Sequence, residues 1–438
     1  MRKFILVFGL VLLELHAQVP AMLGLGDSIG EGVQSADASW RTQPFSYLNL
    51  FARQANVSFP LPLISSSPFG VVGDATLRFR LNPSVRAANL AFSGADINSV
   101  LDRRFQLPVN SEADLVLRPY PGSQVETAES LRPPLVLCWI GSSDVLSAVT
   151  SFSNLNASQM TPVPVFEARF AELARRLTAW GGKVIFGNIP DVTRIGFVAD
   201  PADVQRLLGS DFGLPEGSLT SAAAVLLIRI GLADGSILLD PNYVLDPAEV
   251  ATIRQTIAQF NQIIASHAAA SGMPVVDING LFNNFASNPP TIAGITVRRN
   301  FPGGLFSLDG VHPSNIAQAI ITNAFISAGN TRFAMNIPPI SAQGLASILL
   351  EDPFVDKDRD GKVRGRPLAG LLETLAPLLG ISGDLNDSVP DVNLSGIDTS
   401  RTRNFVQLYS AVTGRSWFAP WDRKASIEAF QRLFHLRQ

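Results

Sequence analysis

Short, continuous apolar runs alternate along the chain with longer amphipathic stretches. Each apolar run ends at glycine or polar residues, which is typical of strands in a sheet that is covered on both faces. The predicted strands span residues 21–25, 87–93, 135–141, 183–189 and 274–278. Apolar residues at helical spacing predict helices over residues 43–56, 164–180, 249–271 and 315–328. This alternation predicts an α/β fold in which a mostly parallel, five-stranded sheet lies between two helix layers.

Three segments interrupt the alternation. Residues 57–86 are rich in Pro, Ser and Gly and predict a long loop, which in a compact domain is usually functional. Residues 199–245 and 280–306 also depart from the rhythm, and after about residue 350 leucine-rich segments and polar turns replace it. We therefore expect a main domain over residues 18–350, with helical and loop insertions at those three places. A small, mainly helical region over residues 351–438 would follow, with a helix near 424–436.

The first residues resemble a secretory signal. A basic start, Met1–Lys3, precedes an apolar run over Phe4–Leu13, and the small residue Ala17 follows. An apolar run of about ten residues is too short to span a bilayer as a helix. We expect a signal peptide over residues 1–17 and an exported protein, whether secreted, periplasmic or at the cell surface. An uncleaved anchor or a buried element is the alternative.

Charge and cysteine content exclude several classes of function. The formal net charge of -3 provides no basic field for nucleic acid. Cys138 is the single cysteine of the 438 residues, which excludes an internal disulfide and multi-thiolate zinc sites. It lies in the apolar run of residues 135–140 and is most simply a core residue.

The first strand ends in a motif that can carry chemistry. Gly26, Asp27 and Ser28 follow the apolar run directly, and Gly30 and Gly32 come next. Such glycines permit a sharp break and a close backbone approach, so that one hydroxyl is delivered to the carboxyl edge of the sheet. Ser28 is therefore a candidate nucleophile, provided that a base can reach it.

The four histidines leave one candidate for that base. His16 lies in the predicted signal, His267 in a predicted helix and His435 near the C-terminus. His312 instead follows Asp309 by three residues, in a loop before the final helix. The carboxylate could bond one ring nitrogen while the other faces the serine, which is the logic of a catalytic triad.

Taken together, these motifs resemble those of the GDSL or SGNH hydrolases, a family of serine esterases and lipases with a three-layer α/β/α fold. Residues 26–28 resemble its first block, 89–94 its second, 141–144 its third and 309–312 its last, and the resemblance spans residues 19–335. It implies that Ser28 is the nucleophile, His312 the general base and acid, and Asp309 the residue that orients the histidine.

The resemblance also implies an oxyanion hole made by the amides of Ser28 and Gly94 and by an asparagine of the third block. This chain has Ser143 at the asparagine position. A serine hydroxyl reaches less far, and loss of one oxyanion donor typically costs about 10²–10³ in rate. Either Ser143 donates, directly or through water, or another group substitutes, or the enzyme is slow.

Residues 26–30 also match the Gly-x-Ser-x-Gly elbow of the α/β-hydrolases. That fold needs several strands and an oxyanion loop before its serine, and too few residues precede Ser28 here. We therefore reject this second interpretation.

Three functions are consistent with the sequence. The first is a serine esterase or lipase that acts on small-molecule or lipid-like carboxylic esters, with possible association with a membrane surface or a polymer. The alternatives are a carbohydrate O-acetylesterase of the same fold and a non-catalytic binding protein that kept the fold. The apolar segment Leu219–Leu239 bears on the choice. It predicts either a helix packed on the core or a lid helix over an acyl-binding cleft.

An acidic run near residue 356 resembles the start of a calcium loop. Asp356, Asp358 and Asp360 alternate before Gly361, an arrangement that can wrap a hard cation, but Pro367 stands where a bidentate acid is expected. A structural Ca²⁺ site and a solvated acidic turn are both open. No cofactor is expected for catalysis.

Overall fold

The computed structural model describes residues 19–66, 78–151, 154–229, 231–300, 303–357 and 363. The predicted signal peptide over residues 1–17 lies outside the described residues, as does the predicted helix near 424–436. Asp358 and Asp360 of the acidic run lie outside them too, whereas Asp356 is described.

The centre of the molecule is a parallel sheet of four regular strands. In spatial order these are β1 (Leu23–Gly26), β2 (Leu135–Trp139), β3 (Lys183–Gly187) and β7 (Val275–Val276). Every residue of β1 and β2 is buried, as the continuous apolar runs predicted. The sheet therefore exposes neither face of these two strands to solvent.

The predicted strand at residues 87–93 extends this sheet at its β1 edge without forming a regular strand. The Gly24 amide donates to the Ala88 carbonyl at 2.9 Å, and the Leu90 amide donates to the Gly24 carbonyl at 2.8 Å. Gly24 and Asn89 form an isolated parallel bridge. The five predicted strands thus correspond to four regular strands and one bridged edge segment.

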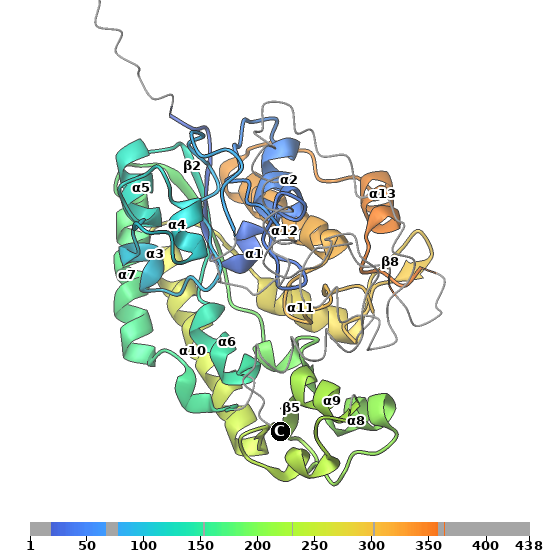
Figure 1. The fold of residues 1–438 in the computed structure, drawn as a ribbon. Coiled ribbons are helices and arrows are strands. Elements are labelled where there is room, and N and C mark those ends of the chain that lie inside the picture. Colours follow the sequence, from blue (N-terminus) through green and yellow to red (C-terminus); the bar gives the residue numbers. More distant parts are fainter. Residues whose placement is uncertain are drawn as a thin grey trace, which may run out of the picture.

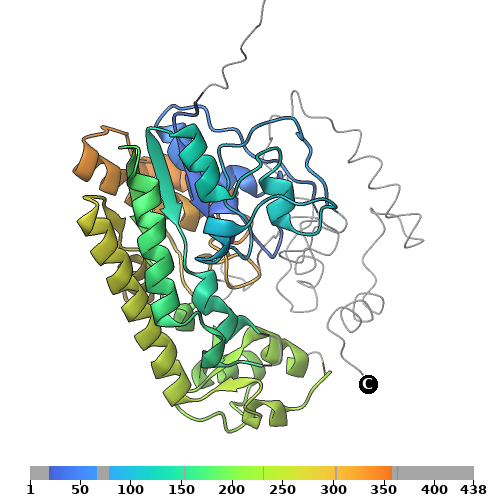
Figure 2. The same ribbon diagram turned by 90° about the vertical axis from the view of Figure 1, so that its left-hand side faces the viewer.

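Helices cover the two faces of the sheet (Figure 1). On one side lie α5 (Gln124–Leu131), α7 (Val163–Thr178) and α10 (Pro247–Ala270), and on the other lie α2 (Tyr47–Gln54) and α12 (Asn315–Phe333). Both α7 and α12 contact β3. Figure 2 shows α7 and α10 side by side along the molecule. The α/β fold with helix layers around a parallel sheet is the predicted one.

Local sequence explains why the long helix α10 begins where it does. Asp246 caps it and forms a capping box with Glu249, and Pro247 occupies the first turn. Its Phe260 ring stacks on Phe166 of α7 with 3.9 Å between the ring centroids. This apolar contact fixes α10 against α7 on one face of the sheet.

The remaining elements of the main domain are short. They are α1 (Ser28–Glu31), η1 (Gln43–Phe45), α3 (Ser99–Asp102), α4 (Glu112–Val116), α6 (Ser143–Thr150), η2 (Ala157–Gln159), η3 (Val192–Arg194), α11 (Ile278–Ser287) and α13 (Ala342–Glu351).

The insertion at residues 199–245 is not made of helices and loops alone, which corrects the prediction. Its strands β4 (Val198–Ala199), β5 (Leu219–Ser221) and β6 (Val244–Leu245) form an antiparallel sheet. Helices α8 (Pro201–Leu208) and α9 (Ala222–Arg229) pack beside it at the lower end of the molecule in Figure 1.

The single helix predicted over residues 219–239 is therefore also wrong. The segment begins as β5, continues as α9 and ends in the 3₁₀ helix η4 (Gly235–Leu239). Gly231 has a φ of 74°, and the Asp234 side chain caps η4, so both residues interrupt a continuous helix. Buried side chains of α9 join those of α8 in a small hydrophobic cluster of their own, apart from the main core.

The insertion at residues 280–306 likewise contains strands. A hairpin of β8 (Thr291–Ile292) and β9 (Ile295–Thr296) follows α11. Ala293 and Gly294 connect the two strands, both with positive φ, which suits a tight hairpin turn.

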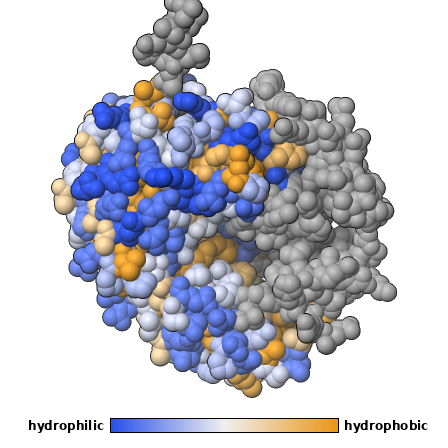
Figure 3. Space-filling view, turned by 60° about the vertical axis from the view of Figure 1, so that its left-hand side comes forward, coloured by the Kyte–Doolittle hydropathy of each residue, from blue (hydrophilic) through white to orange (hydrophobic). Residues whose placement is uncertain are grey.

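Among the described residues, no helix is both long and apolar enough to cross a membrane. The face shown in Figure 3 is mostly hydrophilic, and its apolar residues occur in small groups.

Candidate active site

The chain breaks sharply after β1. An added Cβ atom at Gly26 would lie 2.4 Å from the Trp139 carbonyl oxygen on β2, so only glycine fits this approach of two backbones. Asp27 then caps α1 by accepting a hydrogen bond from the Ile29 amide at 3.0 Å. Ser28 is thus the first residue of a short helix at the carboxyl end of β1.

The structure brings Ser28, His312 and Asp309 together. The Nε2 atom of His312 lies 2.8 Å from the Ser28 hydroxyl oxygen, and its Nδ1 atom lies 2.6 Å from Oδ2 of Asp309. All three residues are buried, with at most 8% of their surface exposed. Serine, imidazole and carboxylate therefore form a continuous hydrogen-bonded relay, largely shielded from solvent.

The Asp309 carboxylate accepts further hydrogen bonds besides the one from the histidine ring. Its Oδ1 atom accepts hydrogen bonds from the amides of Val311 and His312, both at 2.8 Å, and from the Ser307 hydroxyl at 3.1 Å. Burial alone would raise the pKa of Asp309. The charge of His312, the hydrogen bond from its ring and the bonds from the amides of His312 and Val311 outweigh burial and hold the pKa below its usual value. The carboxylate stays ionised and so fixes the histidine ring.

A tight turn that the sequence did not predict supports the same carboxylate. Gln34 and Asp37 exchange backbone hydrogen bonds, and the two residues between them, Ser35 and Ala36, have φ values of 53° and 60°. The Ala36 amide donates to Oδ2 of Asp309 at 2.8 Å. Glycine and asparagine are the usual residues in such a turn, so nothing local in Ser35–Ala36 signals it.

The turn is bonded at further points to the loop of residues 307–312, which contains Asp309 and His312. The Ser35 amide donates to the Ser307 hydroxyl at 2.9 Å, and the Ser35 hydroxyl accepts from the Leu308 amide at 3.3 Å. On its other side, the buried Arg78 guanidinium pairs with Asp37 and with Glu112. The turn is therefore a rigid support for residues 307–309.

Gly94, the second predicted oxyanion donor, lies in a segment that is bonded to the helix of the serine. The Ser93 amide donates to Oε2 of Glu31 at 2.6 Å, and the Ser93 hydroxyl donates to the same oxygen. Gly94 itself has a φ of 77°, and the space beside its α-carbon is open. Within the described residues, its amide donates no hydrogen bond. Glu31 thus positions the residue just before a free amide, a role that the sequence did not predict.

Ser143, the third predicted donor, is the first residue of α6 and is half-buried. Its neighbour Asp144 accepts a hydrogen bond from the Ile97 amide at 2.9 Å, which joins the start of α6 to the segment that follows Gly94. The structure therefore connects the second and third motifs, and the Ser143 hydroxyl has no hydrogen-bond partner within the described residues.

Three buried carboxyl groups surround this region. Burial raises the pKa of Asp27 to about 6, that of Glu31 to about 7 and that of Asp144 to about 7. Hydrogen bonds lower each pKa by less than burial raises it. They run from the Ile29 amide to Asp27, from Ser93 to Glu31, and from Thr161 and Ile97 to Asp144.

Within the described part of the chain, no group of three or more histidine, cysteine, aspartate or glutamate side chains could hold a metal ion. The acidic run of residues 356–361 is described only at Asp356 and Lys357, so the calcium site remains a prediction.

We predict that Ala36→Gly stabilises the protein and leaves catalysis unchanged. Glycine removes the left-handed strain at φ 60° and keeps the amide that donates to Asp309. The free energy of unfolding in urea should rise by about 0.5–1 kcal/mol, with kcat/KM unchanged.

Ala55→Gly is the matched control, because Ala55 has an ordinary φ of -75° and should lose stability when replaced by glycine. A loss of stability in Ala36→Gly equal to that in Ala55→Gly would contradict the strained turn.

We also predict that Asp144→Asn stabilises the protein more at pH 8 than at pH 5. An acid whose pKa rises from 3.8 to about 7 on folding binds protons more tightly in the folded state. Its ionisation therefore costs stability progressively as the pH rises through that range. An asparagine amide can still accept from Ile97 and donate to the Thr161 hydroxyl, which removes the charge and keeps both hydrogen bonds.

Melting temperatures at the two pH values test this prediction. Asp211→Asn, at an exposed aspartate, is the control for the charge change itself. If Asp144→Asn shifts the melting temperature equally at pH 5 and pH 8, the prediction fails.

The chain is similar to several known proteins. Among solved structures, a variant of Axe2, an acetyl xylan esterase from Geobacillus stearothermophilus, is 15% identical, with a TM-score of 0.36 over 73% of this chain and 95% of its own. A lipase/acylhydrolase from Enterococcus faecalis is 12% identical, with a TM-score of 0.34 over 73% of this chain and 97% of its own. LAE5, an alpha/beta hydrolase enzyme from the metagenome of Lake Arreo, Spain, is 14% identical, with a TM-score of 0.35 over 70% and 94%.

No curated protein matches the chain. The family of GDSL-like lipases and acylhydrolases does match it, over residues 22–325. This range contains Ser28, Asp309 and His312 as well as Gly94 and Ser143. With a match over most of its length, the protein belongs to the GDSL-like lipase/acylhydrolase family and is a hydrolase of ester bonds.

Proposed function

We propose that the protein cleaves carboxylic esters through an acyl-enzyme on Ser28. The observation that carries this proposal is the relay of Ser28, His312 and Asp309, with heavy-atom distances of 2.8 Å and 2.6 Å across the histidine ring. These are hydrogen-bond distances for a base that abstracts the proton of a nucleophile.

In the first half-reaction, the Ser28 oxygen forms a bond with the ester carbonyl carbon while its proton passes to Nε2 of His312. The negative charge that develops on the carbonyl oxygen requires donors, and the proposed ones are the amides of Ser28 and Gly94 with the hydroxyl of Ser143. The carbon–oxygen bond to the alcohol then breaks, and the alcohol leaves with the proton from His312. Asp309 stabilises the imidazolium in between.

In the second half-reaction, His312 takes a proton from water, and the hydroxide oxygen attacks the acyl carbon. The bond to Ser28 breaks, the serine oxygen recovers the proton, and the carboxylic acid is released. Burial of the relay strengthens each of these electrostatic contacts because little water competes for them.

Labelling with a fluorophosphonate probe tests these roles. We expect covalent labelling of wild type at Ser28, none in Ser28→Ala, and rates of labelling and ester hydrolysis lower by about 10⁴-fold or more in His312→Ala, because the serine loses its base. His267→Ala is the matched control, since His267 lies on α10 away from the relay.

Wild-type labelling at another residue, or full activity in His312→Ala, would overturn the proposed mechanism. Absence of any labelling in wild type would favour the non-catalytic binding protein.

The proposal also concerns which class of ester the protein hydrolyses. We infer small-molecule or lipid-like esters, and a carbohydrate O-acetylesterase is the alternative within the same chemistry. The segment 219–239, which could have been a lid over an acyl-binding cleft, packs its helix α9 into the insertion's own small core. It therefore provides no argument for long acyl chains.

A series of nitrophenyl esters distinguishes the two. For a lipid-like substrate we expect kcat/KM to rise from acetate to octanoate, because each added methylene buried in an apolar site contributes up to about 0.8 kcal/mol. A preference for acetate would contradict the lipid-like substrate and assign the acetylesterase.

A further inference from the structure

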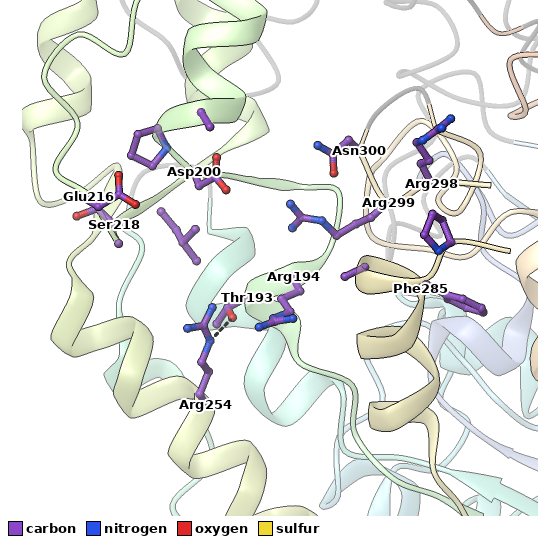
Figure 4. A pocket seen from close by; sticks show the side chains of 16 residues that line it. Thr193, Arg194, Asp200, Glu216, Ser218, Arg254, Phe285, Arg298, Arg299 and Asn300 are labelled. Atoms are coloured by element: carbon purple, nitrogen blue, oxygen red, sulfur yellow. Dashed lines mark hydrogen bonds between the residues drawn. The ribbon is translucent and has the colours of Figure 1, made fainter. Parts of the chain in front are cut away.

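A cleft separates the insertion at residues 199–245 from the main domain. Its volume is about 580 Å³, within the size range of sites for small organic ligands. Neither Ser28 nor His312 lines it. One wall comes from the insertion, at the start of α8 and before β5, and the other from η3, α10 and the segments that flank β8 and β9 (Figure 4).

The main-domain wall carries four arginines, Arg194, Arg254, Arg298 and Arg299 (Figure 4). Within the described residues, three of these arginines form ion pairs, and each does so with a carboxylate that a second arginine also approaches. The Nε atoms of Arg194 and Arg254 both approach the same oxygen of Asp191, each at 3.4 Å. Two guanidinium groups thus share one carboxylate at the long end of ion-pair distances, which leaves positive charge for a further anion.

The same pattern recurs at the other end of this wall. Arg299 approaches Asp203 at 3.5 Å, while Arg206 pairs with the second oxygen of that carboxylate at 3.0 Å. Arg298 is exposed and forms no ion pair within the described residues. Guanidinium groups bind carboxylates and phosphates through paired N–H donors, so this wall suits an oxyanion.

The insertion wall has a different chemistry. The carboxylates of Asp200 and Glu216 line it, and so does Ser218, whose residue is 1% exposed. The Ser218 hydroxyl is buried and has no hydrogen-bond partner within the described residues. Buried hydroxyls in folded proteins are almost always paired, so the Ser218 hydroxyl is an unpaired polar group in this wall.

The two walls together select one kind of molecule. The arginines would take an oxyanion at one end, while the carboxylates and the serine would pair with hydroxyl groups at the other. The volume exceeds what a bare phosphate or carboxylate needs, so the anion is carried on a larger, hydroxyl-bearing body. We propose that the cleft between the insertion and the main domain binds an acidic carbohydrate, a sugar acid or a sugar phosphate.

The cleft is connected to the loop of residues 307–312, which contains Asp309 and His312. Phe197 follows the cleft residue Arg194 by three positions, and its amide donates to the Gly310 carbonyl at 2.8 Å. A ligand in the cleft therefore lies against the segment of Phe197. That segment is hydrogen-bonded to Gly310, which stands between Asp309 and His312 in the sequence. The binding site itself is independent of ester hydrolysis and can be measured without it.

Isothermal titration calorimetry on the full chain tests the proposal with glucuronate, glucose 6-phosphate and inorganic phosphate as probes, and with glucose as the uncharged control. We expect at least one of the two acidic sugars to bind with a Kd below about 10 mM, and glucose to bind at least tenfold more weakly. The double variant Arg194→Gln, Arg254→Gln should lose at least tenfold in affinity, because both guanidinium groups that share Asp191 are removed.

Arg175→Gln is the matched control for the loss of an exposed arginine on a helix, and it should bind as wild type does. Ser218→Ala probes the insertion wall and should weaken binding of the acidic sugar without affecting binding of inorganic phosphate. Circular dichroism confirms that each variant is folded.

Binding of glucuronate alone assigns the sugar acid, and binding of glucose 6-phosphate alone assigns the sugar phosphate. The proposal is overturned if neither acidic sugar binds, if glucose binds as tightly as they do, or if the double arginine variant keeps wild-type affinity. Because no ester is present, these outcomes do not depend on the role of Ser28.

Discussion

The hydrogen bond between Ser28 and His312 is the contact on which the rest of this structure depends. It joins residues that are 284 positions apart, at 2.8 Å, so almost the whole main domain must fold before it can form. The parallel sheet places β1 beside β2, and α12 covers β3 and β7, so that the loop before α12 reaches the carboxyl end of β1. Enzymes of such doubly covered sheets use that edge because helix N-termini and loops converge there.

Around this contact the protein retains features that are unfavourable for stability alone. Two non-glycine residues, Ser35 and Ala36, occupy left-handed conformations in one turn, and Glu31 and Asp144 are buried carboxyl groups whose pKa values rise to about 7. Each feature holds one backbone amide in place. The turn directs the Ala36 amide to Asp309, Glu31 binds the Ser93 amide next to Gly94, and Asp144 binds the Ile97 amide at the start of α6. Strain and buried charge commonly gather at functional sites, where surrounding contacts compensate for them.

The insertion adds a second unit of structure to this catalytic body. Its antiparallel sheet and two helices enclose a small hydrophobic cluster of their own, and α10 extends from the main domain to β6. Where the two units meet, arginines of one face carboxylates and a serine of the other. Clefts between such units are frequent ligand sites, because each side can contribute chemistry that a single layer cannot combine.

The sequence by itself determined the strands of the sheet, the main helices, and the candidates Ser28, Asp309 and His312. These follow from local rules: continuous apolar runs in doubly covered strands, 3.6-residue periodicity in helices, and the scarcity of histidine. Local rules could not reveal the turn at Ser35–Ala36, because neither residue is typical of it. They also misjudged residues 219–239, where an apolar run fits a helix or a strand equally well and only packing in the insertion selects between them.

Only the tertiary structure decided which distant groups share a site. Glu31 and Ser93, or Ser35 and Ser307, are pairs without a sequence signal, since their meeting depends on how loops cross at the sheet edge. The cleft arginines come from η3, α10 and the segment after β9, which lie far apart along the chain. Sequence periodicity determines which face of an element is buried, whereas the position of one element against another depends on packing over the whole domain.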